Sequence, residues 1–267
     1  MKFVKRNDWE KEWKQTLARE RDYLRKNAQA KDSPLQQKLE THIPETLQTT
    51  LDSAFCKAFS LIFEKGTGVI EHTYNRKKKT EGAAARHTEA AEKGDRAALR
   101  AFHSDASFTA GKNLALSGVE GVGLGLLGIG IPDIPLFTAM MLKSLYELAD
   151  GYGFPRNTPN EKRFLLQLIE TALSHGEALT AGSRALDRYI GLGRWDNAVP
   201  LQAQIAQTAR CLSGELLYMK FLQGIPIAGA VGGAYDVVYL HRVQRFARIK
   251  YHKRFLLAQK NKKEFYQ

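Results

Sequence analysis

The sequence of 267 residues predicts an all-α fold: a single helical domain in which two glycine-rich apolar segments pack centrally. Apolar residues recur at helical spacing along most of the chain, and no stretch shows the sustained two-residue alternation of a β-strand. Ser33-Pro34 and Thr158-Pro159 are typical of helix starts, with the hydroxyl residue as N-cap and proline at the first helical position. Hydrophobic residues make up 43% and charged residues 25%, which excludes a collagen-like, disulfide-stapled or wholly disordered chain.

The N-terminal part is expected to contain helices and one polar segment. Residues 8–30 are rich in Lys, Glu, Arg and Leu, with tryptophans and leucines near helical spacing. After Pro44, an apolar stripe from Leu47 to Ile62 predicts another helix. We expect residues 1–45 to form an N-terminal helical extension. The polar, alanine-rich residues 75–97 are expected to be an insert or linker.

The C-terminal part is expected to contain three further helices. Thr158, Pro159 and Glu161 form a capping box, and the helix that they open carries an apolar stripe to Leu173. Residues 201–223 are helical in character, and residues 234–258 are expected to form the last helix. Five apolar residues of that helix are expected to line one side: Leu240, Val243, Ala247, Tyr251 and Phe255. The main helical domain is therefore expected over residues 46–258, followed by a basic tail at 259–267.

Two glycine-rich apolar segments, residues 114–135 and 224–233, need an explanation, because glycine destabilises a helix interior by about 1 kcal/mol relative to alanine. Glycines four residues apart let two helices approach closely. The interpretation is either a tight helix crossing in a soluble core or a wedge that enters one membrane leaflet. The glycines and prolines given this structural role are Gly121, Gly125, Gly128, Pro132, Pro135, Pro226, Gly229 and Gly233.

The formal net charge of +12 is unevenly distributed. Residues 241–267 hold nine Lys and Arg against one acid, whereas residues 1–50 are nearly balanced, with eleven bases against eight acids. The last helix therefore has the character of a basic amphipathic helix, suited to a membrane surface or a helical partner, although it could equally be a core helix with a solvated back. Its candidate polyanion-binding residues are Arg242, Arg245, Arg248, Lys250, Lys253 and Arg254.

No membrane-spanning helix and no secretory signal are expected. The longest run without a charged residue is Phe221 to Tyr235, shorter than the ~20 apolar residues of a spanning helix. The first residues lack an apolar stretch after the basic ones. Cys56 and Cys211 suggest a reducing compartment. We expect a cytoplasmic protein that can lie peripherally at the inner face of the cell membrane.

Catalytic and metal-binding patterns are largely missing from the sequence. It contains no GxxxxGK[ST], GxSxG, HExxH or CxxC pattern, so no metal and no cofactor are expected. The weak catalytic candidates are the acids Asp133, Asp236 and Glu120, which lie beside the glycine-rich segments. Burial there would require them to be paired, hydrogen-bonded or protonated. The alternative for Asp133 is helix capping.

Three features in order resemble the EcsC protein family, over roughly residues 47–257. They are the glycine-rich segment that ends in Pro132-Asp133-Ile134-Pro135, the Tyr152-Gly153 pair, and the segment from Ile225 to Asp236 that leads to a basic helix. This bacterial family is named for the third product of an operon encoding an ABC transporter. The resemblance implies a helical, cytoplasmic protein often linked to envelope processes, and brings no catalytic residues with it. The chain departs from the family pattern in its long 75–97 segment and in Phe154, where an acidic residue is expected.

Three functional hypotheses follow. The leading one is a non-enzymatic helical protein that associates with an anionic membrane surface or a membrane-protein partner, as an accessory to an envelope or ABC-transport process. The first alternative is an enzyme, or a small-ligand or lipid-binding protein, with its pocket between the glycine-rich segments. The second is nucleic-acid binding through the basic C-terminal helix, for which no known motif is present. The sequence does not predict an oligomeric state.

Overall fold

The computed structural model describes residues 6–28, 45–65, 134–196, 199–222 and 233–264. Seven helices and no strand occur in these ranges, so the all-α prediction is confirmed. The helices are α1 (Arg6–Asn27), α3 (Glu45–Glu64), α7 (Ile134–Gly151), α8 (Pro159–Leu173), α9 (Gly176–Leu192), α10 (Leu201–Leu222) and α11 (Gly233–Glu264).

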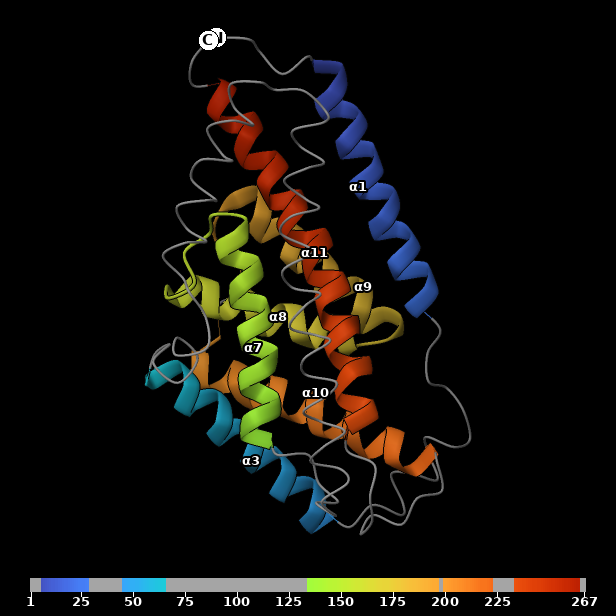
Figure 1. Cartoon of the computed structure of the whole chain (residues 1–267), viewed down its shortest axis with the longest axis vertical. Helices are drawn as coiled ribbons and strands as arrows, with labels where there is room; N and C mark the ends of the chain where they lie inside the picture. The colour runs from blue at the N-terminus through green and yellow to red at the C-terminus, as the bar shows by residue number, and fades with distance from the viewer. Residues whose placement is uncertain (1–5, 29–44, 66–133, 197–198, 223–232, 265–267) are drawn as a thin grey trace.

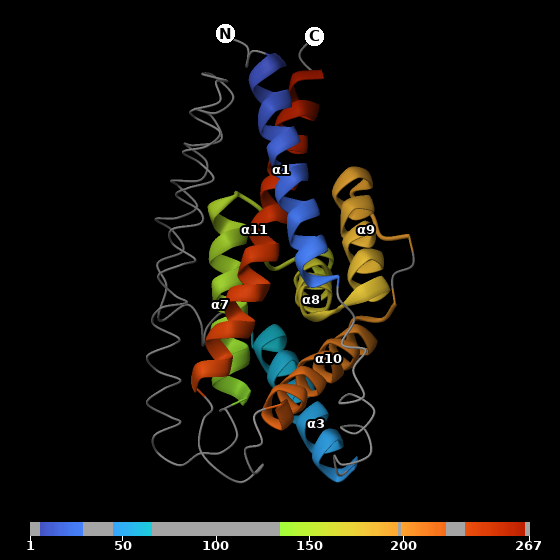
Figure 2. The ribbon, with the colours of Figure 1, turned by 90° about the vertical axis from the view of Figure 1, so that its right-hand side faces the viewer.

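Helix α11 is the axis around which the other helices are arranged. Helices α1, α7, α8 and α9 all contact it, while α3 and α10 cross each other at one end of the molecule (Figure 1). Helix α10 also packs on α8, which links this crossing to the rest of the bundle. Figure 2 shows α1 and α11 running along each other, with α7 on one side and α9 on the other. The centre of the bundle is therefore α11.

Helix α11 is buried on most of its circumference, which corrects the expectation of an amphipathic helix. The five apolar residues predicted to line one side are all buried, as expected. Phe246, Lys250, His252 and Leu256 are buried as well, although they lie on other sides of the helix. Apolar periodicity predicted only one buried side of α11. The polar residues buried on its other sides pair with residues of other helices, and periodicity within one helix does not show such pairs.

Helix α1 is part of the same packed unit, although the sequence analysis placed it in an N-terminal extension. It runs antiparallel to α11: the Trp9 indole Nε1 donates to the Leu256 carbonyl at 2.9 Å, and Tyr23 contacts the Arg242 carbonyl at the other end. The Tyr23 hydroxyl also donates to the Ala172 carbonyl of α8 at 3.2 Å. At the opposite end of the chain, α11 continues to Glu264, into the predicted basic tail.

Helix α8 begins as its sequence predicts. The Thr158 hydroxyl accepts a hydrogen bond from the Glu161 backbone N–H at 3.1 Å, and Pro159 occupies the first helical position. Helix α9 ends at Leu192 and is capped by Gly193, whose φ of 70° is a left-handed conformation that glycine adopts without strain. The N-cap determines where α8 begins, and the glycine determines where the connection from α9 to α10 begins.

The predicted packing of the two glycine-rich segments stays a prediction. Most of both segments, and the polar stretch 75–97, lie outside the described residues. Pro135 lies in the first turn of α7, and Gly233 is the first residue of α11. Six of the predicted structural residues are not described: Gly121, Gly125, Gly128, Pro132, Pro226 and Gly229.

Candidate functional site

The three acids proposed as catalytic candidates are not brought together by what the structure describes. Glu120 and Asp133 lie outside the described residues, and Asp236 lies in the first turn of α11 with its side chain not described. A pocket between the glycine-rich segments therefore stays a prediction. Among the described residues, no three His, Cys, Asp or Glu side chains converge as metal ligands.

Two of the predicted polyanion-binding residues form part of a buried charge cluster between α1, α9 and α11. The Lys250 ammonium is fully buried and donates to the Ser183 hydroxyl at 2.8 Å, to the Asp187 carboxylate at 2.6 Å and to Glu20. The Lys253 ammonium lies 2.7 Å from the Glu20 carboxylate and 2.8 Å from that of Asp187. Two ammonium groups thus face two carboxylates, and the cluster is electrically neutral.

The electrostatics of the cluster favour the charged forms. Burial alone would raise the pKa of Glu20, but Lys250 and Lys253 outweigh it and hold that pKa below its ordinary value. Burial would likewise lower the pKa of Lys253, and the two carboxylates outweigh it and raise that pKa. The cluster is a paired, internally satisfied set of charges that joins three helices.

Arg254 is also an interior side chain. Its Nη1 donates to both oxygens of the Glu161 carboxylate, at 2.8 and 3.1 Å, and its guanidinium lies 4.0 Å from the centre of the Phe154 ring. The same Glu161 accepts a hydrogen bond of 2.6 Å from the Tyr251 hydroxyl. Burial would lower the pKa of Arg254, but the Glu161 carboxylate outweighs it and raises that pKa. Arg254 therefore joins α11 to α8.

The expectation of a polyanion-binding face on α11 is corrected by these positions. Lys250, Lys253 and Arg254 are paired in the interior and are not available to an external polyanion. Arg242 is half-buried and donates to the Ser174 carbonyl at 2.9 Å. Arg248 is half-buried as well, and burial lowers its pKa. Of the six predicted residues, Arg245 alone is exposed.

An exposed basic surface is found instead on α1, and we call it the α1 outer face. The sequence of this segment looks nearly balanced in charge, but Glu12 and Glu20 point inward and are buried. Asp22, which pairs with Arg25 at 3.0 Å, and Glu10 are the acids that remain exposed on it. Its exposed basic residues are Lys11, Lys14, Arg19, Arg21, Arg25 and Lys26. This surface was not predicted from the sequence, because the bases and acids of the segment nearly cancel along the chain but lie on different sides of the helix.

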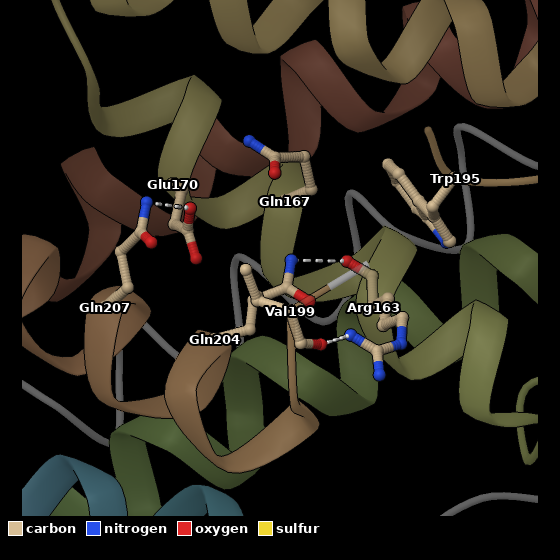
Figure 3. A pocket seen from close by; sticks show the side chains of 7 residues that line it. All are labelled: Arg163, Gln167, Glu170, Trp195, Val199, Gln204 and Gln207. Carbon is tan, nitrogen blue, oxygen red and sulfur yellow. Dashed lines mark hydrogen bonds between the residues drawn. The ribbon is translucent and has the colours of Figure 1, made fainter. Parts of the chain in front are cut away.

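A polar cavity of about 140 Å³ lies between α8, α10 and the connection between α9 and α10 (Figure 3). Arg163, Gln167 and Glu170 contribute from one face of α8, since residues four and three apart lie on the same side of a helix. Gln204 and Gln207 contribute from α10 with the same kind of spacing. The remaining wall is made by Trp195 and Val199. This spacing of polar residues on two helices is visible in the sequence, although the cavity was not predicted from it.

Glu170 is the buried acid of this cavity, with 5% of its surface exposed. The Gln207 amide donates to its carboxyl at 3.1 Å, and the Thr208 hydroxyl lies 2.5 Å from its other oxygen. Burial, which the hydrogen bond from Thr208 only partly offsets, raises the pKa of Glu170 to about 7. Within the described residues, no cation is paired with this carboxyl.

The hydrogen-bond geometry is compatible with a neutral as well as an ionised Glu170. The Thr208 hydroxyl lies 2.9 Å from the Gln204 carbonyl, one helical turn earlier, as well as 2.5 Å from the Glu170 carboxyl. A hydroxyl carries a single hydrogen, and a carbonyl oxygen can only accept. If Thr208 donates to the carbonyl, the hydrogen in the other contact comes from Glu170, which is then a carboxylic acid.

The opposite side of the cavity carries a cation and an aromatic wall. Arg163 donates through Nη1 to the Val199 carbonyl, which holds the guanidinium beside the connection between α9 and α10. The Trp195 ring stacks on Tyr189, with ring centroids 4.3 Å apart. Figure 3 shows Glu170 and Gln207 on one side of the view, and Arg163 and Trp195 on the other. The cavity thus combines one guanidinium, one carboxyl group and several amides.

Comparison with known proteins gives one result. The model of the EcsC protein family matches residues 10–256, a range that begins within α1 and ends within α11, and this confirms the resemblance drawn from the sequence. No curated protein and no solved structure matches the chain.

Proposed function

We propose that the chain, which belongs to the EcsC protein family, is a non-enzymatic peripheral protein that contacts an anionic membrane surface through the α1 outer face. The observation that carries the proposal is the composition of that face, which has six exposed basic residues against two exposed acids. The proposal keeps the membrane hypothesis of the sequence analysis and transfers the contact from α11 to α1.

The charge of the α1 outer face is suited to reversible adsorption. Each Lys or Arg near an anionic bilayer contributes about 1 kcal/mol, so several on one face together give measurable binding at moderate ionic strength. The attraction is screened by salt within about 10 Å at ~0.1 M. We therefore expect binding that weakens steeply as salt is added.

The same face lacks the apolar side chains of a membrane-inserting helix. Ala18 is the only apolar residue exposed on α1 between residues 8 and 27. Interfacial helices that enter the headgroup region carry large apolar residues on one side. Helix α1 directs its apolar side to α9 and α11 instead, so the proposed contact is electrostatic. None of the helices in the described ranges combines the length and hydropathy needed to cross a membrane.

The cellular setting belongs to the same proposal. An anionic surface facing the cytoplasm is provided by the inner leaflet, where juxtamembrane basic residues are attracted. An accessory role in an envelope or ABC-transport process, expected from the family resemblance, is consistent with a position at that leaflet. A membrane-protein partner with an acidic cytoplasmic surface would meet the same α1 outer face.

Flotation with vesicles tests the proposal. The full chain is mixed with phosphatidylglycerol-containing or purely zwitterionic vesicles, at low and high salt. We expect flotation with the anionic vesicles at low salt only. The triple variant Lys14→Glu, Arg21→Glu, Arg25→Glu should lose it.

A matched control carries the same change of net charge on another helix. Arg184, Arg188 and Arg194 are exposed on and just after α9, and their replacement by Glu should leave most of the flotation intact. Loss of binding in both variants would mean that only net charge matters, and would reject a specific α1 contact. Absence of wild-type flotation at low salt would reject the membrane proposal. Nucleic-acid binding without flotation would favour the alternative instead.

A further inference from the structure

We propose that the cavity between α8 and α10 is a binding site for a small hydroxylated carboxylate, an acid of about three carbons. Different helices build this site from those that form the α1 outer face, so it is a function additional to membrane contact. Nothing in the proposed membrane contact uses Arg163, Gln167 or Glu170.

The guanidinium of Arg163 provides the anion-binding group. Its Nη1 is held by the Val199 carbonyl, and within the described residues it has no carboxylate partner. Arg163 is only half-buried, so its remaining N–H donors are accessible from the cavity. A guanidinium binds a carboxylate through two parallel hydrogen bonds. A ligand carboxylate would therefore pair with Arg163 in the way that the Glu161 carboxylate pairs with Arg254.

The glutamines provide acceptors for hydroxyl groups. Each of the three lining glutamines uses its amide nitrogen as a donor within the protein, which leaves its Oε1 without a hydrogen-bond partner in the described part of the chain. A hydroxyl of the ligand can donate to such an oxygen. The internal bonds are those from Gln167 to Thr171 Oγ1 at 3.2 Å, from Gln204 to the Arg163 carbonyl at 3.2 Å and from Gln207 to Glu170 at 3.1 Å.

The carboxyl of Glu170, in its neutral form, adds a hydrogen-bonding group to the cavity without adding a negative charge. A buried acid without a cation partner is costly to the fold, and such groups are concentrated at functional sites. In its neutral form Glu170 does not repel an anion, and its carboxyl is linked through Thr208 to the Gln204 carbonyl. The cavity therefore offers one positive charge and otherwise neutral hydrogen-bonding groups.

The size of the cavity limits the ligand. A volume of about 140 Å³ is close to that of a cavity of about 150 Å³ that holds benzene, so it suits a ligand of about six or seven non-hydrogen atoms, such as a hydroxylated acid of three carbons, and is too small to enclose a nucleotide. The exposed residues Val199 and Gln207 lie at its edge, so a ligand can enter from solvent.

Calorimetric titration of the full chain with three probes tests the proposal. Glycerate carries both the carboxylate and the hydroxyls, propionate only the carboxylate, and glycerol only the hydroxyls. We expect saturable glycerate binding, and binding of either other probe that is weaker by about tenfold or more. No saturation with glycerate up to about 10 mM, or equal binding of glycerate and propionate, would overturn the proposal.

Variants then assign the site to the cavity. Arg163→Gln should weaken glycerate binding by about tenfold or more, whereas Arg184→Gln, a change at an exposed arginine of α9, should not alter it. Binding to Arg163→Gln that equals wild type would show that glycerate lies elsewhere and would overturn the assignment. Far-ultraviolet circular dichroism establishes that each variant is folded. The comparison of the three probes uses wild type alone, so it tests the class of ligand even where a variant fails to fold.

Discussion

Glu170 makes the unfolding free energy of this protein depend on pH in a way that one substitution can isolate. Burial raises the pKa of this carboxyl from its ordinary value of 4.5 to about 7 in the folded state. Between these two pH values the folded state binds a proton that the unfolded state has released. The contribution of this proton to the free energy of unfolding is fully present below about pH 4.5 and is lost as pH rises through about 7.

The size of this loss of stability follows from the difference between the unfolded and the folded pKa of Glu170. A difference of one pH unit between folded and unfolded pKa corresponds to about 1.4 kcal/mol, so Glu170 contributes a loss of about 3 kcal/mol between acidic pH and about pH 8. Glu170→Gln keeps the shape of the side chain and does not ionise. Relative to this variant, wild type should therefore lose about 3 kcal/mol as the pH is raised.

Urea unfolding followed by circular dichroism, at several values between about pH 4.5 and 8, measures that difference. Other titrating groups are common to both proteins and cancel. Glu64→Gln, at an exposed glutamate at the end of α3, is the matched control and should change the unfolding free energy by about 0.5 kcal/mol or less. A wild-type minus Glu170→Gln difference that stays constant with pH would refute the assignment of a buried, protonated carboxyl.

Three further substitutions test the packing by urea unfolding. Glu20→Ala leaves two interior ammonium groups short of a carboxylate and should cost about 3–5 kcal/mol. Thr158→Ala removes the N-cap bond of α8 and should cost about 1 kcal/mol. Gly182→Ala should destabilise by about 1–3 kcal/mol, because its added Cβ would collide with the Thr171 side chain, whereas Gly191→Ala, in open space on the same helix, should be neutral or stabilising by up to about 1 kcal/mol.

Each of these results can fail in a specific way. A Glu20→Ala variant as stable as wild type would show that the cluster between α1, α9 and α11 is not closed to water. An unchanged unfolding free energy for Thr158→Ala would show that the observed cap bond is replaced by water at no cost. Equal effects of alanine at Gly182 and Gly191 would contradict the close approach of α8 and α9.

The sequence predicted helix starts and buried stripes well where the relevant interactions lie within one helix. The capping box at Thr158 and Pro159 predicted the start of α8, because the N-cap bond involves residues three apart. The apolar stripe from Leu240 to Phe255 predicted five of the buried residues of α11, because helical periodicity places them on one side. Both features depend on a single helix.

The charges of α11 could not be assigned in the same way. Lys250 and Arg254 look like a solvated basic face until their partners are known, and those partners, Glu20 and Glu161, lie far away in the sequence. A buried ion pair requires two residues whose proximity depends on the tertiary arrangement of helices. The composition of α11 alone gives its net charge and not the side to which each charge points.

The α1 outer face and the cavity were missed for related reasons. The acids Glu12 and Glu20 compensate the bases of α1 in a count along the sequence, although they lie on its buried side. The spacing of Arg163, Gln167 and Glu170 was visible in the sequence, but the second wall, from α10, is supplied by tertiary packing. The glycine-rich segments, in which sequence analysis placed the centre of the fold, lie outside the described residues.

The most direct measurement is the rate at which each lysine is acetylated in the folded protein, read by mass spectrometry with and without anionic vesicles. We predict that Lys11 and Lys14 react rapidly and become protected when vesicles are added. Lys250 and Lys253, which are paired in the interior, should react slowly in both conditions. Rapid labelling of Lys250 and Lys253, together with vesicle protection there and not on α1, would contradict the account and restore α11 as the membrane-binding helix.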